Sequence, residues 1–267
     1  MAKKSSKNIR VSSDDKVIVD NILNLGCKYG KFQVFEDFIC MLGYEISNSV
    51  DPIHYEERFE NYKKIRKKYS DKELELFNEM AVSFVMGMEK NLYSRDTLGE
   101  IYHSLNLNNE NNGQYFTPFH VCEAMAKMCL GNAPSEIKEK GYITICEPTC
   151  GSGAMLIAAA DSLFIDKYNP STDMCCLAVD NDYRCCMMAY IQLSLLGIPA
   201  VVVHGNSLTV EEFTRFYTPA YVWNGWVWRE PLGMTTKRSI DDEKLRCLTE
   251  PLYYLMKYGL GKDSKAS

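Results

Sequence analysis

Hydrophobic residues in the first part of the chain recur every three to four positions, which is the spacing of one face of an α-helix. Gly26 and the pair Asp51-Pro52 interrupt the pattern, as residues that end helices do. The spacing predicts an all-helical region over residues 11–110, after a polar, basic arm of residues 1–10. The expected helices cover about residues 14–25, 32–46, 55–68, 71–90 and 96–105.

The pattern changes beyond residue 140. Residues 142–146 are mostly β-branched or apolar, as in a buried strand, and similar runs follow at 174–179 and 200–203. Helix-forming stretches at 154–164 and 183–196 separate these runs. Strands that alternate with helices form a parallel sheet with helices packed on it. The sequence therefore predicts an α/β protein in which a Rossmann-like domain, residues 111–267, follows the helical domain across an asparagine-rich joint.

A glycine turn directly follows the first predicted strand. The strand ends at Glu147-Pro148, and Gly151 and Gly153 then allow a tight turn into a helix. A GxG turn alone is weak evidence for a ligand, and Leu156 stands where a dinucleotide fingerprint needs a third glycine. A carboxylate at the end of the strand can meet a cationic ligand group, so the stretch indicates a nucleotide-type cofactor site.

Asp180 ends the second predicted strand. Its two carboxylate oxygens can accept hydrogen bonds from both ribose hydroxyls of a bound nucleoside. The alternative is an N-cap, because a helix is expected to begin at Tyr183.

The spelling EPTCGSGAM at residues 147–155, with GQYFTP at 113–118 upstream, resembles the adenine-N6 DNA methyltransferases that use S-adenosylmethionine. The likeness is greatest to the modification subunit of type I restriction systems, and it covers about residues 111–208. It implies a methyltransferase fold in which the upstream block packs over the methionine end of the cofactor. The cofactor-binding residues that it implies are Tyr115, Phe116, Thr117, Glu147, Pro148, Gly151, Gly153, Asp180 and Asn206. Without the resemblance, Thr117-Pro118 would simply read as the cap and first residue of a helix.

Asn206 follows the third predicted strand, where the resembled family usually has an aspartate that accepts from the adenine amine of the cofactor. An amide oxygen can accept the same bond without charge assistance, so we expect modestly weaker adenine recognition. His204 is expected to be a strand-end residue rather than a catalyst.

The loop that holds the target base in the resembled family, Asn-Pro-Pro-aromatic, does not occur in this chain. The nearest string is Thr218-Pro219-Ala220-Tyr221, and no clear apolar strand precedes it. A threonine hydroxyl can accept a hydrogen bond, and Tyr221 could stack on a base. Thr218, Pro219 and Tyr221 are therefore the candidate catalytic residues of a degenerate motif.

Residues 215–229 around this string hold all three tryptophans and two arginines. One interpretation is a platform on which bases stack. The other is a hydrophobic plug or subunit contact, in which a hairpin around Asn224-Gly225 places Trp223 beside Trp226.

Charge and composition limit the possible partners. The net charge of -5 is unusual for a protein that binds DNA, so DNA binding requires a local basic face or a basic partner. The most basic stretch, residues 55–68, is either a phosphate-contacting helix or a solvated face stabilised by ion pairs.

The eleven cysteines include no CxxC motif, so neither disulfides nor a metal site is expected. No apolar run approaches the roughly 20 residues that span a bilayer, and no signal peptide is visible, which favours the cytoplasm.

The sequence thus predicts an S-adenosylmethionine-dependent protein that methylates adenine N6 in DNA, as part of a restriction-modification system and with a specificity or other partner subunit; an oligomer is possible. Only about 60 residues follow Leu208, which is too few for a complete seven-stranded sheet and a target-recognition domain. The alternative is therefore a catalytically degenerate subunit that binds the cofactor or a partner and serves regulation, assembly or antirestriction. A methyltransferase for small molecules or proteins is a third possibility that GQYFTP disfavours.

Overall fold

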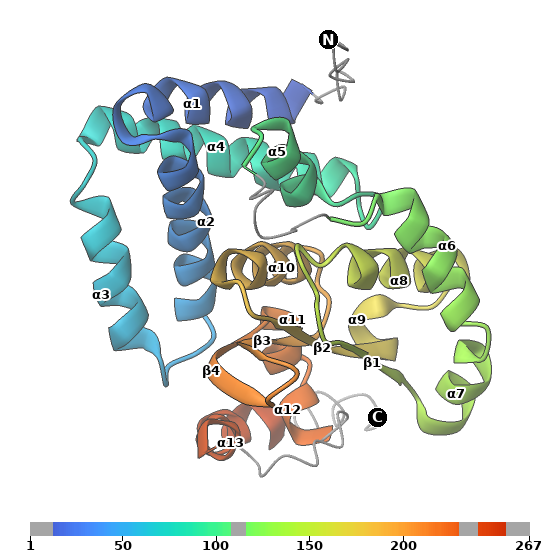
Figure 1. Cartoon of the computed structure of the whole chain (residues 1–267). Helices are drawn as coiled ribbons and strands as arrows, with labels where there is room; N and C mark the ends of the chain where they lie inside the picture. The colour runs from blue at the N-terminus through green and yellow to red at the C-terminus, as the bar shows by residue number, and fades with distance from the viewer. Residues whose placement is uncertain (1–12, 108–115, 230–239, 255–267) are drawn as a thin grey trace, which may run out of the picture.

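The computed structural model describes residues 13–107, 116–229 and 240–254, and it joins a helical N-terminal half to a sheet with helices on both faces (Figure 1). The five helices expected from the hydrophobic spacing are confirmed. One boundary is wrong, because α1 continues through Gly26. The expected arm of residues 1–10 and most of the expected joint lie outside the described residues. The helices are α1 (Ser13–Tyr29), α2 (Lys31–Asn48), α3 (Tyr55–Arg66), α4 (Asp71–Lys90) and α5 (Thr97–Ser104).

The described part of the second half contains a four-stranded sheet in the order β1-β2-β3-β4. The first three strands are parallel and match the sequence prediction, whereas β4 pairs antiparallel with β3. The sequence analysis missed β4, because its first three residues are exposed and only its last three are buried. Such a strand lacks a continuous apolar run. The strands are β1 (Ile143–Glu147), β2 (Met174–Asp180), β3 (Ala200–Asn206) and β4 (Glu211–Tyr217).

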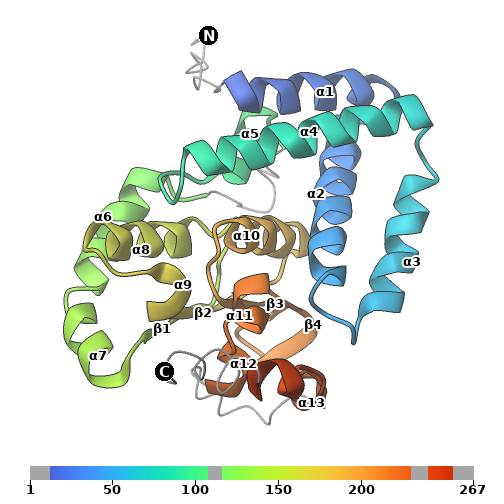
Figure 2. The same cartoon turned by 180° about the vertical axis from the view of Figure 1, so that it is seen from behind.

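Helices cover both faces of this sheet (Figures 1 and 2). Met174 and Cys176 of β2 pack in a large hydrophobic cluster with α8 and α10. Cys175 and Val201 belong to a second cluster, with Trp226 and other side chains of α11 to α13. Successive side chains of a strand point to opposite faces, so the two clusters are the two faces of one sheet. This layered α/β arrangement confirms the predicted fold class. The remaining helices are α6 (Phe119–Cys129), α7 (Ala133–Lys140), α8 (Ala154–Ile165), α9 (Pro170–Asp173), α10 (Tyr183–Leu195), α11 (Pro219–Trp223), α12 (Trp226–Arg229) and α13 (Ile240–Tyr254).

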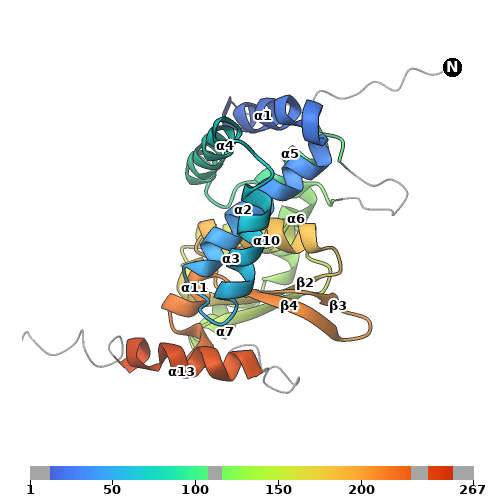
Figure 3. The ribbon, with the colours of Figure 1, turned by 90° about the vertical axis from the view of Figure 1, so that its left-hand side faces the viewer.

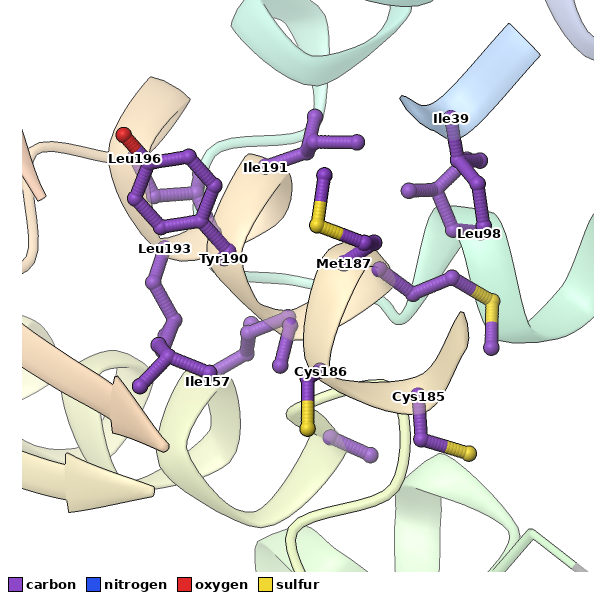
Figure 4. Packing of buried hydrophobic residues seen from close by; sticks show 14 of the residues in the cluster. Ile39, Leu98, Ile157, Cys185, Cys186, Met187, Tyr190, Ile191, Leu193 and Leu196 are labelled. Carbon is purple, nitrogen blue, oxygen red and sulfur yellow. The ribbon is translucent and has the colours of Figure 1, made fainter. Parts of the chain in front are cut away.

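Helix α10 lies in the centre of the hydrophobic core, between the sheet and the helical half (Figure 4). Every residue from 185 to 194 is buried, so α10 has no solvent-facing stripe. Helix α2 packs so closely on it that a Cβ at Gly43 would lie 2.2 Å from the Cε atom of Met187. Ile39 of α2 and Leu98 of α5 belong to the same cluster. The helical half and the sheet therefore share one hydrophobic core.

Helix α13 lies against the second face of the sheet (Figure 3), where Leu245 is fully buried. Within the described residues, α13 runs from Ile240 to Tyr254. In the described ranges, no helix combines the length and the apolar character that crossing a bilayer requires.

The hairpin expected around Asn224-Gly225 is wrong, because this turn connects two short helices, α11 and α12. Trp226 is fully buried, its ring edge faces Tyr142, and its Nε1 donates to the carbonyl of Ser171 at 3.1 Å. Trp223 in contrast is 56% exposed. For Trp226, packing is therefore the correct interpretation of the aromatic stretch.

Arg58 of the basic helix α3 points into the protein and is 4% exposed. Its Nη1 donates to Asp51 Oδ2 at 2.6 Å and to the Ser47 hydroxyl, and its Nη2 donates to the Arg215 carbonyl of β4 at 2.6 Å. The guanidinium also lies over the ring of Phe216, 4.3 Å from its centroid. This one side chain thus joins the helical half to the edge strand of the sheet.

The partner carboxylate of Arg58 is fully buried. Burial by itself would raise the pKa of Asp51, but hydrogen bonds from His54 and the charge of Arg58 hold that pKa below its usual value. Lys63 and Lys64, in contrast, make exposed contacts within α3, to Glu60 and Asn61. The basic stretch therefore contains one structural arginine and several surface lysines.

We expect Arg58→Ala to lower the free energy of unfolding by roughly 3–5 kcal/mol, because it leaves the Asp51 carboxylate buried without its cation. Lys63→Ala is the matched control, since it removes an exposed ion pair of the same helix and should leave the stability nearly unchanged. Urea denaturation of both variants measures the difference. Equal stabilities would contradict the structural role of Arg58.

Candidate functional site

The glycine turn between β1 and α8 depends on two residues with left-handed backbone angles. Gly151 has φ +53° and Gly153 has φ +95°, and the latter is the N-cap of α8. A Cβ at Gly153 would lie 3.3 Å from the Cα of Ala189 in α10, and a Cβ at Gly151 would lie 3.2 Å from the ring of Phe116. Both glycines therefore serve close packing as well as the turn.

Asp180 connects the end of β2 to this turn. Its Oδ2 accepts from the backbone N–H of Gly151 at 2.9 Å, and its Oδ1 accepts from the N–H of Asp182 at 2.9 Å. Burial raises the pKa of Asp180 above its usual value, and backbone hydrogen bonds from Asp182, Gly151 and Asn181 oppose that shift. The N-cap of α10 is Asp182, which accepts from the N–H of Arg184, so the capping interpretation of Asp180 is wrong.

Glu147 lies at the end of β1 and is partly buried, followed by the exposed Pro148. Its Oε1 is 3.3 Å from both the backbone nitrogen and the hydroxyl of Thr149, which donate to it. Strand register pairs Glu147 with Ala178 and Asp180 with His204, so the carboxyl ends of the three parallel strands meet at one edge of the sheet. Glu147, the glycine turn and Asp180 therefore lie together, as the sequence predicts.

Asn206 lies at the same edge, at the end of β3. Its Oδ1 accepts from the backbone N–H groups of Leu208 at 3.0 Å and Thr209 at 3.3 Å. The oxygen expected to face the adenine amine therefore already stabilises the turn between β3 and β4.

The upstream block contacts the glycine turn through Phe116. Its ring meets the rings of Tyr102 and His103 edge-on, with centroids 5.5 and 5.3 Å away. Thr117 is exposed, and α6 begins at Phe119 after an N-cap at Pro118 without a side-chain hydrogen bond, so the expected threonine cap is wrong. Tyr115 lies outside the described residues.

The structure does not bring the candidate catalytic residues together with this site. The Thr218 hydroxyl accepts from the Ala200 N–H at 2.8 Å and donates to the Ile198 carbonyl at 2.8 Å. Ala200 begins β3, and Asn206 ends it, so Thr218 and the adjoining Pro219 lie at the opposite end of the strand, roughly 20 Å away. Tyr221 is 7% exposed and belongs to the second hydrophobic cluster. This placement argues against the catalytic role expected for Thr218, Pro219 and Tyr221. The sequence analysis did not predict the antiparallel strand β4, which runs back along β3 and ends beside its first residues.

Sequence reasoning also missed three buried polar residues beside the glycine turn. Ser152 donates from its hydroxyl to Asp96 of the helical half, and Gln192 of α10 donates to both Asp96 and the Ser152 carbonyl. The available signal was Gln192, a polar residue that directly follows the apolar run of residues 185–191 in a helix.

A model of the N-6 DNA methylase family matches residues 93–245, which is more than half of the chain. A solved structure from Listeria monocytogenes, described as a class I S-adenosylmethionine-dependent methyltransferase, is similar at a TM-score of 0.41 and 11% sequence identity, over 89% of this chain and 78% of that one. No protein of curated function matches the chain.

We expect Gly153→Ala to lower the free energy of unfolding by roughly 1–3 kcal/mol, because an L-residue is strained at this φ and its Cβ would crowd Ala189. Two controls separate these causes. Gly197 has φ +67° with nothing near its Cβ position, and Gly131 has neither constraint. In thermal and urea unfolding, Gly153→Ala should therefore be the least stable variant, Gly197→Ala intermediate and Gly131→Ala the most stable. A Gly153→Ala variant as stable as the unmodified protein would contradict the packing role.

Proposed function

The chain belongs to the N-6 DNA methylase family, whose methyl donor is S-adenosylmethionine, and from this premise we propose that it binds that cofactor at the glycine turn and methylates adenine N6 in DNA. The observation that carries the proposal is the meeting of Glu147, the glycine turn and Asp180 at the carboxyl ends of parallel strands. Ligands of open α/β sheets bind at this edge.

The residues at this edge fit the chemistry of the cofactor. A carboxylate offers about four acceptor positions, and the backbone N–H groups of Gly151, Asn181 and Asp182 bond to the carboxylate of Asp180, so a position remains for a ribose hydroxyl. The cofactor carries an ammonium group and a sulfonium group. The carboxylate of Glu147 is positioned to attract one of these cationic groups. The ring of Phe116 lies against Gly151 of the turn, where it limits access of water.

S-adenosylmethionine, when bound, supplies a methyl group that its positive sulfur already activates. The protein therefore needs to orient the two reactants rather than to provide a strong base. In this proposal Asp180 and Glu147 hold the cofactor, and Gly151 and Gly153 let the backbone approach it.

DNA binding must come from a local charge pattern or a partner, because the net charge of the chain is -5. Arg58 is buried, so the surface cations at this end of the basic stretch are Lys63, Lys64 and Arg66 of α3, followed by Lys67 and Lys68. A specificity subunit, as in a type I restriction-modification system, is the partner that we propose. The cytoplasmic location expected from the sequence suits this role and stays a prediction.

A second function is favoured by one specific observation. Thr218 and Tyr221 lie far from the glycine turn, so they do not provide the contacts that would hold a flipped base there. We therefore keep the alternative of a cofactor-binding subunit whose partner completes the catalytic site.

We expect Asp180→Ala to weaken binding of S-adenosylmethionine at least about tenfold, since it removes the carboxylate proposed to accept from the ribose and one contact that shapes the turn. Isothermal titration calorimetry measures this change. Asp166→Ala is the matched control, because Asp166 is an exposed acid outside the site. The affinity of this variant for S-adenosylmethionine should equal that of the unmodified protein. Equal affinity in both variants would refute the ribose role of Asp180.

Methyl transfer itself is tested with isotope-labelled S-adenosylmethionine and mixed-sequence DNA, with N6-methyladenine read by mass spectrometry. We expect label on adenine that is lost in Asp180→Ala. Binding of the cofactor without transfer to DNA would instead support the incomplete subunit.

Tyr221→Leu extends the same assay, because it removes the ring that could stack on a base. Since Tyr221 is buried away from the glycine turn, we expect the folded variant to retain full transfer. Loss of transfer by a folded Tyr221→Leu protein would restore the catalytic role that its sequence suggested.

A further inference from the structure

A buried polar network joins the N-terminus of α5 to the glycine turn. Asp96, the N-cap of α5, accepts from the Gly99 N–H at 3.0 Å, from Gln192 Nε2 at 2.8 Å and from the Ser152 hydroxyl. Gln192 Nε2 also donates to the Ser152 carbonyl at 2.8 Å, and its Oε1 accepts from the Leu98 N–H at 3.0 Å. The network thus connects the helical half, α10 and the turn.

The residues of this network are almost completely withdrawn from water. Asp96 is 5% exposed, Ser152 is 1% exposed, and Gln192 is fully buried. A buried carboxylate is costly unless hydrogen bonds satisfy it, and three donors and the N-terminus of α5 do so here. Removal of one member leaves the others with unsatisfied polar atoms, so the network acts as a unit.

The approach of α5 to the turn depends on a third glycine. A Cβ at Gly99 would lie 2.0 Å from Asp96 Oδ2 and 2.8 Å from the Ser152 hydroxyl oxygen. Only glycine at this position permits the contact between the helix and the turn.

Ser152 lies between the two glycines of the turn. On one side, Asp180 of β2 holds the backbone N–H of Gly151. On the other side, Asp96 holds the Ser152 hydroxyl and Gln192 holds its carbonyl. The turn is therefore held from the sheet and from the helical half at the same time.

From this arrangement we propose that Asp96 is a positioning residue for the cofactor site, and that the N-terminal helical half sets cofactor affinity by holding the glycine turn through Ser152 and Gln192. The inference rests on the proposed binding of S-adenosylmethionine at this turn. A hydrophobic contact would suffice to pack α5 on α10, whereas directional hydrogen bonds fix the orientation of the Ser152 peptide unit.

The test is a double-mutant cycle with Ser152→Ala and Asp96→Asn, in which calorimetry measures the affinity for S-adenosylmethionine. Each single variant should weaken binding about fivefold to tenfold, because each loses one or two hydrogen bonds that orient the turn. The double variant should bind about as weakly as Asp96→Asn alone, because Asp96 acts through Ser152. Additive losses would overturn the proposed route.

Glu100→Gln is the matched control. It breaks the ion pair of Glu100 with Arg95, which also contacts Asp15 of α1, and so weakens the attachment of α5 without contact to the turn. We expect a lower melting temperature with unchanged affinity for S-adenosylmethionine. If affinity instead falls with melting temperature in all variants alike, the network is merely structural and the inference fails.

The outcomes separate this inference from the proposed function. If the unmodified protein binds S-adenosylmethionine and folded Ser152→Ala binds equally well, the inference fails while the proposed function stands. If the unmodified protein does not bind, both fail. Should Asp96→Asn not fold by far-UV circular dichroism, Ser152→Ala with the Glu100→Gln control decides the question.

Discussion

The burial of α10 is the constraint on which the rest of the structure depends. A helix that is buried all round must be covered on every side, and the sheet supplies one side while α2 and α5 supply the other. The helical half is therefore part of the hydrophobic core that supports the glycine turn. Gly43 and Gly153 allow this packing, since each lets a neighbouring element approach α10 closely.

Polar contacts then determine how the helices are positioned on the hydrophobic core. Hydrophobic burial is not directional, so it brings α5 to α10 and α3 to the edge of the sheet without specifying their exact positions. Asp96 and Gln192 fix α5 against the glycine turn, and Arg58 fixes α3 against β4. Each of these polar groups is buried and hydrogen-bonded, because a buried charge without partners would destabilise the fold.

The two ends of the sheet have different chemistry. The carboxyl ends carry Glu147, the glycine turn and Asp180, which together suit a cationic nucleoside cofactor. The amino end of β3 carries Thr218 and the buried aromatic cluster, where polar groups already bond to the backbone. In the proposed function, transfer to DNA uses residues near the first end or residues of a partner. The aromatic stretch mainly stabilises the second face of the sheet.

The sequence by itself determined the helices of the first half, the three parallel strands and the glycine turn, because hydrophobic spacing and glycine geometry are local properties of a chain. It also placed Glu147 and Asp180 at one edge, since parallel strands end on the same side. Only the tertiary structure decided the pairing of β4, the distance of Thr218 and Tyr221 from the turn, and the inward direction of Arg58. Only tertiary structure, too, brought Asp96, Ser152 and Gln192 together, because they lie far apart in sequence and their hydrogen bonds form when α5 and α10 pack. Contacts between distant segments depend on how whole helices and strands pack on one another. A short sequence pattern contains no information on that packing.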